Sequence, residues 1–150
     1  MTYERLMIEY SHIKIIEDAD MPIGLGGLCK NKVIYINKHI SKYDKHTVLA
    51  EEIGHYETTY GNITDQSIVR NRQLESVARR WAYRKIVSLE NIVDCYIKGH
   101  TTLYDMCCHL EISPEFLKTS IDYYIAKYGA SIEKDEFLVM FEPLNVQKII

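Results

Sequence analysis

Short apolar runs are the main feature of the N-terminal part of the chain. Residues 13–17 and 33–37 are rich in β-branched side chains, which is typical of strands. Residues 24–29 lie between them and can form a third strand that their glycines loosen. We therefore expect a small antiparallel sheet over residues 13–37, preceded by a short helix over residues 3–11.

Further along the chain, apolar residues recur every three or four positions, as they do on one face of an α-helix. Leu49, Ile53, Tyr56 and Tyr60 form one such stripe, and Asp44 is a candidate N-cap for their helix. A second stripe predicts a helix over residues 71–89. Its apolar face consists of Leu74, Val77, Ala78, Trp81, Ala82 and Ile86.

The C-terminal part of the chain is also predicted to be mainly helical. Helices are expected over residues 102–110 and 114–128, and Ser113 followed by Pro114 is a typical N-cap and first helical position. Residues 137–141 have the character of a strand. The pattern indicates one α+β domain over residues 1–150, with a core of about 1–90 and a helical C-terminal extension of about 91–150.

Composition narrows the class of protein. The chain has 150 residues, 47% of them hydrophobic and 26% charged, which fits one globular domain. Its net charge is -3, so it lacks the basic surface of a nucleic-acid-binding protein, and direct nucleic-acid binding is not expected. The chain shows neither a secretory signal nor an apolar stretch of about 20 residues, so we expect a cytoplasmic protein with no membrane association. The four cysteines are accordingly expected to be reduced.

The strongest chemical signal lies on the first long helix. Glu51 and His55 are four residues apart and therefore project from the same helix face, with Glu52 beside them. In H-E-x-x-H zinc peptidases, two residues at this spacing bind the metal and the Glu after the first ligand is the general base. Here Glu51 occupies the first ligand position, where a carboxylate can also bind zinc. Taken alone the pattern is weak, because a solvated polar helix face explains it, and Glu9 and His12 repeat the E-x-x-H spacing.

Glu75 supplies a third candidate ligand. It lies on the second helix, and Ala78 and Ala82 share its side of that helix. Small side chains there would let the two helices approach closely enough to share one metal ion.

Together these segments resemble a known family. Residues 49–56 are similar to the metal-binding helix of ImmA/IrrE metallopeptidases, and residues 75–82 resemble the second helix of that family, which supplies the third ligand. The order of the predicted elements agrees as well, and the resemblance covers about residues 3–129. It implies an α+β fold with a small antiparallel sheet near the N-terminus, a zincin-like helical core and a helical C-terminal region.

The resemblance also implies a site. Glu51, His55 and Glu75 match the metal ligands and Glu52 matches the general base. The implied cofactor is one divalent metal, Zn²⁺, with Mn²⁺ or Fe²⁺ as alternatives because two carboxylates make the ligand set richer in oxygen than His₂Glu. Tyr35, Tyr56 and Tyr60 are candidates for stabilising the oxyanion, and the sequence does not choose among them.

Two functions follow from the resemblance. The first is a metal-dependent endopeptidase that cleaves a helix-turn-helix repressor and so acts as an anti-repressor for a phage or mobile element. The alternative is a non-catalytic protein-binding module of the same fold that inactivates a repressor by contact. Residues 102–129 could complete the core or dock a protein partner, and their acidic residues argue against contact with phosphates.

Overall fold

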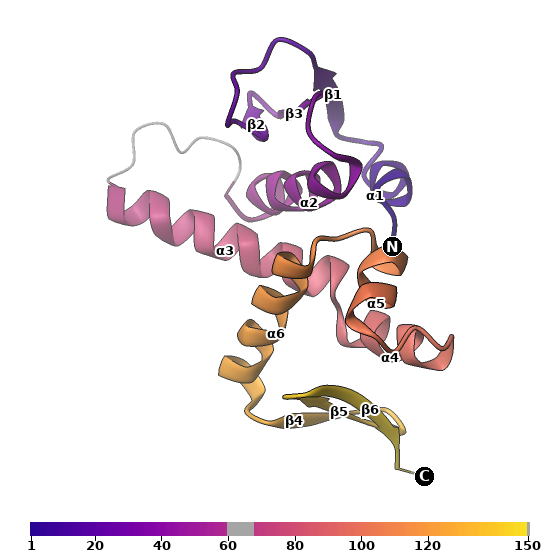
Figure 1. The fold of residues 1–150 in the computed structure, drawn as a ribbon. Coiled ribbons are helices and arrows are strands. Elements are labelled where there is room, and N and C mark those ends of the chain that lie inside the picture. Colours follow the sequence, from indigo (N-terminus) through magenta and orange to yellow (C-terminus); the bar gives the residue numbers. More distant parts are fainter. Residues whose placement is uncertain (60–67, 150) are drawn as a thin grey trace. The chain divides into compact units, whose positions relative to one another are not determined.

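The computed structural model describes residues 1–59 and 68–149, and it divides the chain into two compact units, Met1–Ala82 and Tyr83–Ile150 (Figure 1). We describe each unit by itself. The division predicted from the sequence, into a core of about 1–90 and an extension of about 91–150, stays a prediction. Among the described residues, no helix is both long enough and apolar enough to cross a membrane.

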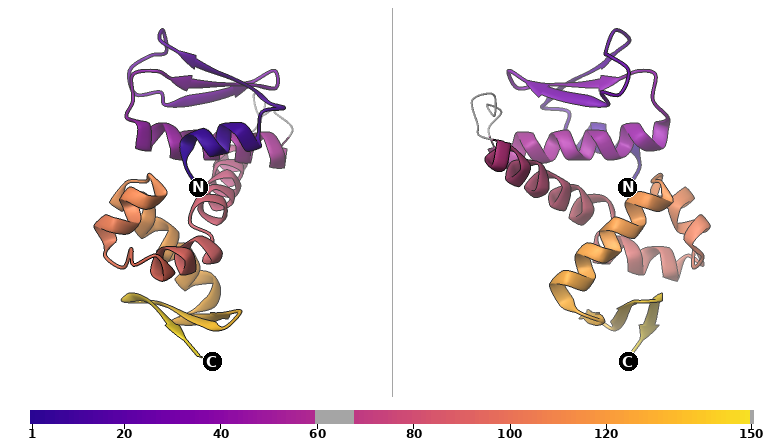
Figure 2. Two further views of the ribbon diagram at one scale, coloured as in Figure 1. Left: turned by 90° about the vertical axis from the view of Figure 1, so that its right-hand side faces the viewer. Right: turned by 60° about the vertical axis from the view of Figure 1, so that its left-hand side comes forward.

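The first unit combines a three-stranded sheet with helices. Its elements are α1 (Tyr3–Glu9), β1 (Lys14–Asp18), β2 (Gly27–Lys30), β3 (Val33–Asn37), α2 (Lys42–Thr59) and the larger part of α3 (Ile68–Ile86). The sheet lies over α2, and α1 packs beside the same helix (Figure 2). The α+β class expected from the sequence is confirmed.

The pairing of the sheet differs from the antiparallel arrangement that we expected. The strand order is β1-β3-β2, and β1 runs parallel to β3, with Lys14 opposite Val33. Only β2 pairs antiparallel with β3, through a two-residue turn in which Asn31 and Lys32 both have positive φ angles, as a type I′ hairpin requires. The alternation of side chains along a strand does not encode the direction of its partner, and the hairpin places β2 and β1 on opposite sides of β3.

The core of the first unit lies between the sheet and α2. Ile34 and Ile36 of β3 and Leu49 and Ile53 of α2 are all fully buried. The helix begins at Lys42, before the predicted cap Asp44, whose backbone N–H donates to the Ser41 hydroxyl at 3.1 Å. Leu49 and Ile53 of the predicted stripe therefore face the core, and Tyr60 lies outside the described residues.

The second unit contains the end of α3 and the C-terminal elements. They are α4 (Leu89–Ile97), α5 (Leu103–Leu110), α6 (Pro114–Tyr128), β4 (Ser131–Lys134), β5 (Phe137–Phe141) and β6 (Leu144–Lys148). The helix predicted over residues 71–89 is α3, which ends three residues earlier, because Ser88 leaves helical geometry and caps the next helix, α4. At α6 the predicted cap is confirmed: the Ser113 hydroxyl accepts from the backbone N–H of Phe116 at 3.1 Å.

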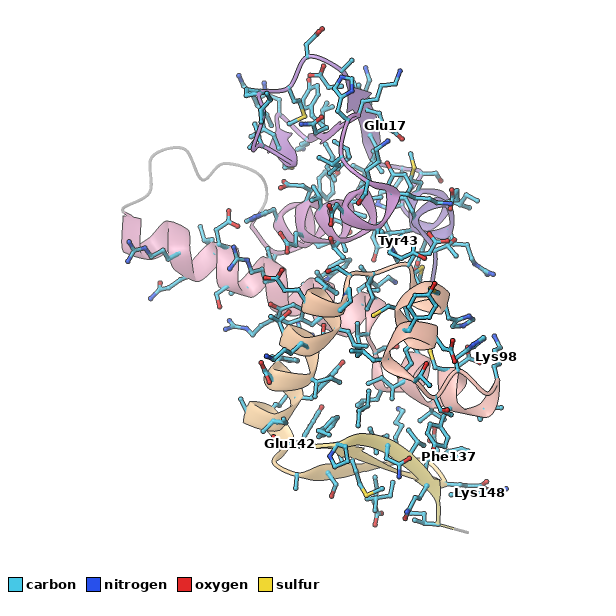
Figure 3. All side chains as sticks on the ribbon, viewed as in Figure 1. Glu17, Tyr43, Lys98, Phe137, Glu142 and Lys148 are labelled. Carbon is cyan, nitrogen blue, oxygen red and sulfur yellow. The ribbon has the colours of Figure 1, made fainter. Side chains whose placement is uncertain are left out.

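A helical extension was expected over residues 91–150, but only its first part is helical. Its last residues form an antiparallel sheet in the order β4-β5-β6, in which Phe137 pairs with Lys148 (Figure 3). The predicted strand over residues 137–141 is the central strand of this sheet. The neighbouring strands β4 and β6 were not predicted, because they are short and mix polar with apolar residues. All four cysteines are free, and Cys95 and Cys107 are buried.

Candidate active site

Helix α2 carries three of the four residues that the sequence analysis selected. Leu49 and Ile53 hold one side of this helix in the core, so the orientation of the whole helix is set by packing. His55 is 5% exposed, whereas Glu51 and Glu52 are half-buried. The three side chains therefore lie in an environment from which much of the water is excluded.

A close approach of two helices brings the fourth residue to this environment. A Cβ atom added to Gly54 would lie 2.8 Å from the carbonyl oxygen of Ala78 and 3.3 Å from Cβ of Trp81. The backbone of α3 therefore packs directly on α2, at a position where α2 has no side chain. Ala78 and Ala82 are fully buried, which fits the role that the sequence analysis assigned to their small size.

This approach places Glu75 of α3 against His55 of α2. His55 Nε2 lies 3.1 Å from Glu75 Oε1. Two ligand atoms of a tetrahedral zinc ion, each about 2.0–2.2 Å from the metal, lie about 3.3–3.6 Å apart. The observed separation of 3.1 Å is slightly shorter, and the residue types are those of metal ligands, so the pair fits two ligands of one divalent metal after a small adjustment.

Glu51 is near this pair but is less clearly part of it. Burial raises the pKa of Glu51, while the positive charge of Arg79 lowers it and the negative charge of Glu75 raises it further. Both charges come from α3, so Glu51 lies on the side of α2 that faces that helix. Within residues 1–59 and 68–149, no group of three or more His, Cys, Asp or Glu side chains is arranged to hold a metal. The assignment of Glu51 as a ligand stays a prediction.

Glu52 has a more strongly perturbed carboxyl group than Glu51. Burial and then the negative charges of Glu75 and Glu51 raise its pKa to about 7. A carboxylate with a pKa near neutrality is suited to accept and return a proton at physiological pH. Its role as the general base is still a prediction, but its environment suits that role.

The edge strand β2 lies next to Glu52, a feature that the sequence analysis did not identify. A Cβ atom added to Gly27 would lie 3.1 Å from Cγ of Glu52 and 2.5 Å from Val48. Only a glycine leaves room for this approach. The signal was present in the sequence, because a glycine inside a strand often marks a site where another group comes close to the backbone.

The oxyanion-stabilising residue stays open. Tyr35 on β3 and Tyr56 on α2 are both half-buried, and the third candidate, Tyr60, lies outside the described residues. Arg79 is a further candidate that the sequence analysis missed. Its charge acts on Glu51, and it follows Glu75 by four residues on the same helix, the spacing that places side chains on one face.

The sequence was compared with family models, with curated proteins and with solved structures, and one family model matches it. The family model described as the IrrE N-terminal-like domain, a peptidase family, matches residues 8–122. Searches of the curated proteins and of the solved structures found no match. The matched residues span most of the chain and include α2, α3 and the four residues discussed above. The chain therefore belongs to the IrrE N-terminal-like family and carries a domain of metallopeptidase type.

Proposed function

We propose that this protein is a metal-dependent endopeptidase that cleaves a helix-turn-helix repressor and thereby ends the dormancy of a phage or mobile element. The observation that carries the catalytic part is the contact of His55 Nε2 with Glu75 Oε1 across two helices. The site has the residue types that peptide hydrolysis requires, and the family is a peptidase family. The repressor as substrate and the role in dormancy rest on the resemblance in the sequence.

Each residue has a chemical role in this proposal. His55, Glu75 and Glu51 hold one divalent cation, Zn²⁺ or alternatively Mn²⁺ or Fe²⁺, which when bound supplies a Lewis acid for the scissile carbonyl group. Glu52 accepts a proton from the attacking water and returns it to the leaving amine. Burial and then the negative charges of Glu75 and Glu51 favour the protonated form of Glu52, which supports its assignment as the group that carries the proton.

The second candidate is a binding module that keeps the fold and inactivates its partner by contact. Glu51 favours this alternative, because a site with two carboxylates cancels the charge of a divalent cation and activates water less strongly than a histidine-rich site. The side chain of Glu75 is 53% exposed. This also favours the binding module, since exposed ligands hold a metal less rigidly.

A Glu52→Gln substitution separates the two candidates. Purified wild-type protein and the variant are each incubated with a panel of helix-turn-helix repressors, and the products are identified by mass spectrometry of new N-termini. The proposal expects cleavage of one repressor by the wild type and a loss of at least about 100-fold in the variant, with metal content unchanged. If the variant inactivates the repressor as fully as the wild type, the protein acts by contact and the endopeptidase proposal is wrong.

A further inference from the structure

A groove of about 440 Å³ lies on the second unit, and none of the residues that line it belongs to the candidate active site. One wall is a face of α6, and the other is formed by the hairpin of β5 and β6. Leu117, Ile121 and Phe141 form its buried floor. The groove is therefore lined from within one compact unit.

The α6 wall is one continuous helix face. Pro114, Leu117, Ile121 and Ile125 line the groove at spacings of three, four and four residues. This stretch is about 16 Å long at 1.5 Å per residue. Leu103 also lines the groove and is 55% exposed, so apolar surface remains accessible to solvent. This stretch of α6 is as long as about three turns of a helix, so it can contact one face of a second helix over that length.

Charged residues surround the apolar floor, and they are mostly acidic. The lining contains Glu115, Asp122 and Glu142 against the single cation Lys118, which is a net charge of -2 from three acids and one lysine. All four side chains are exposed. In the part of the chain that the structure describes, none of the three carboxylates is engaged in an ion pair. The rim therefore favours a positively charged occupant.

The walls of the groove indicate which conformation the occupant has. Phe141 belongs to β5, which is the central strand of its sheet and is already paired on both sides. Leu144 belongs to the edge strand β6, so the helical conformation is indicated by the α6 wall and not by the sheet. Apolar side chains at spacings of three and four residues pack against the matching apolar face of a second helix, and a groove lined in this way is suited to an amphipathic helix.

We propose that this groove, bounded by α6 and the β5–β6 hairpin, docks an amphipathic helix of a protein partner whose apolar face is flanked by lysine or arginine. The identification of that partner with the protein that is cleaved rests on the proposed function. The docking itself does not, because the groove shares no residue with the candidate active site. The groove then recruits the substrate, and the site on α2 and α3 cuts it.

The test uses two synthetic helical peptides of about 14 residues, or roughly four turns. Both carry leucines on one face; one has lysines on the flanks and the other has glutamates. Binding of each labelled peptide to the full chain is measured by fluorescence anisotropy, and the contacted residues are mapped by NMR. We expect the lysine-flanked peptide to bind at least about tenfold more tightly and to shift resonances of α6 and the β5–β6 hairpin.

Two charge-reversal variants of equal net charge make the test specific. The variant D122K/E142K reverses two acids of the rim, whereas D20K/E133K reverses two exposed acids elsewhere. The rim variant is expected to lose about tenfold in affinity for the lysine-flanked peptide, and the control variant is expected to retain wild-type affinity. Equal losses in both variants, or equal binding of the two peptides, would overturn the inference.

Two further outcomes separate this inference from other readings. If the resonances of the groove shift with protein concentration in the absence of peptide, the face joins copies of this chain and the inference is overturned. If the lysine-flanked peptide binds as expected while no repressor is cleaved, docking stands and the proposed function fails. If a repressor is cleaved with the same KM by D122K/E142K and by wild type, the proposed function stands and recruitment by the groove fails.

Discussion

At the scale of single residues, burial decides how the charged groups behave. His55 is almost fully buried, and the carboxylate of Glu75 reaches it from another helix. The pKa of Glu52 rises to about 7, because burial and the negative charges of Glu75 and Glu51 penalise the ionised form. A divalent cation bound near these carboxylates would relieve that penalty, which favours metal uptake by the folded chain.

The metal ligands are tested by removing them one at a time. Wild-type protein is expected to retain one Zn²⁺, Mn²⁺ or Fe²⁺ per chain, and Glu51→Ala and Glu75→Ala are each expected to lose it, because a site with two remaining ligands binds weakly. Elemental mass spectrometry on untagged protein measures this. Glu57→Ala, at an exposed position of the same helix, is the control and should retain the metal. Full metal content in Glu51→Ala would place the first ligand elsewhere.

A second residue-scale prediction concerns Glu17 on β1 (Figure 3). Lys45 donates to its carboxylate at 2.7 Å and Tyr3 donates at 3.2 Å, and these bonds, the one from Lys45 first, lower its pKa. Because the folded-state pKa is below the unfolded value, the ionised group stabilises the fold above about pH 4.5. That stability is lost as the pH falls through the folded-state pKa.

Urea unfolding of wild type and Glu17→Gln at two pH values measures this effect. At pH 7 we expect the variant to be less stable by under about 1 kcal/mol, since the Glu17 side chain is 34% exposed and solvent screens the pair. At about pH 3 the two proteins should have the same free energy of unfolding. A difference that is independent of pH would assign the effect to packing instead.

At the scale of elements, the contact between α2 and α3 decides whether the site exists. Glu75 reaches His55 only because the backbone of Ala78 lies against Gly54. The β2 strand makes a comparable approach to Glu52 at Gly27. Glycine thus permits two close approaches near the site: the backbone of α3 at Gly54, and the side chains of Val48 and Glu52 at Gly27.

Gly54→Ala tests the helix contact and has two opposed effects. Alanine is the better helix former by about 1 kcal/mol, which would stabilise the protein. Its methyl group would however lie 2.8 Å from a backbone oxygen, and overpacking of this kind costs about 1–3 kcal/mol. We expect lower stability in thermal unfolding together with reduced metal content.

Glu57→Ala is again the matched control, because it introduces the same residue into the same helix at an exposed position. It should leave both stability and metal content close to wild type. If Gly54→Ala were more stable than wild type and kept its metal, the two helices would not need this close approach.

At the scale of the whole molecule, the two compact units have different tasks in our proposals. The first unit contains the residues that bind metal and move protons, and the second contains the groove for a partner helix. The helix α3 belongs to both, since the boundary falls between Ala82 and Tyr83.

Hydrogen exchange with and without metal tests this division. Metal at about 100 times its dissociation constant stabilises the state that binds it by about 2.7 kcal/mol. We expect the added protection in α2 and in the part of α3 around Glu75, with little change in α5 and α6. Glu75→Ala is the control and should show no metal-dependent protection. Protection spread equally over both units would mean that they unfold as one cooperative body.

Much of this protein follows from local sequence patterns. The period of apolar residues predicts the helices around residues 49–56 and 75–82, and a spacing of four residues places Glu51 and His55 on one face, because helix geometry is local. The cap at Ser113 is predicted for the same reason, since a side chain and a backbone N–H three residues apart are enough to form it. The family resemblance also rests on such segments and agrees with the family match.

Tertiary structure alone decided the rest. The parallel pairing of β1 with β3 and the position of β2 beside Glu52 both join segments that are distant in sequence. So does the distance of 3.1 Å between His55 and Glu75, which are twenty residues apart. Such distances depend on which surfaces bury each other, and periodicity in one segment carries no information about the partner that covers it.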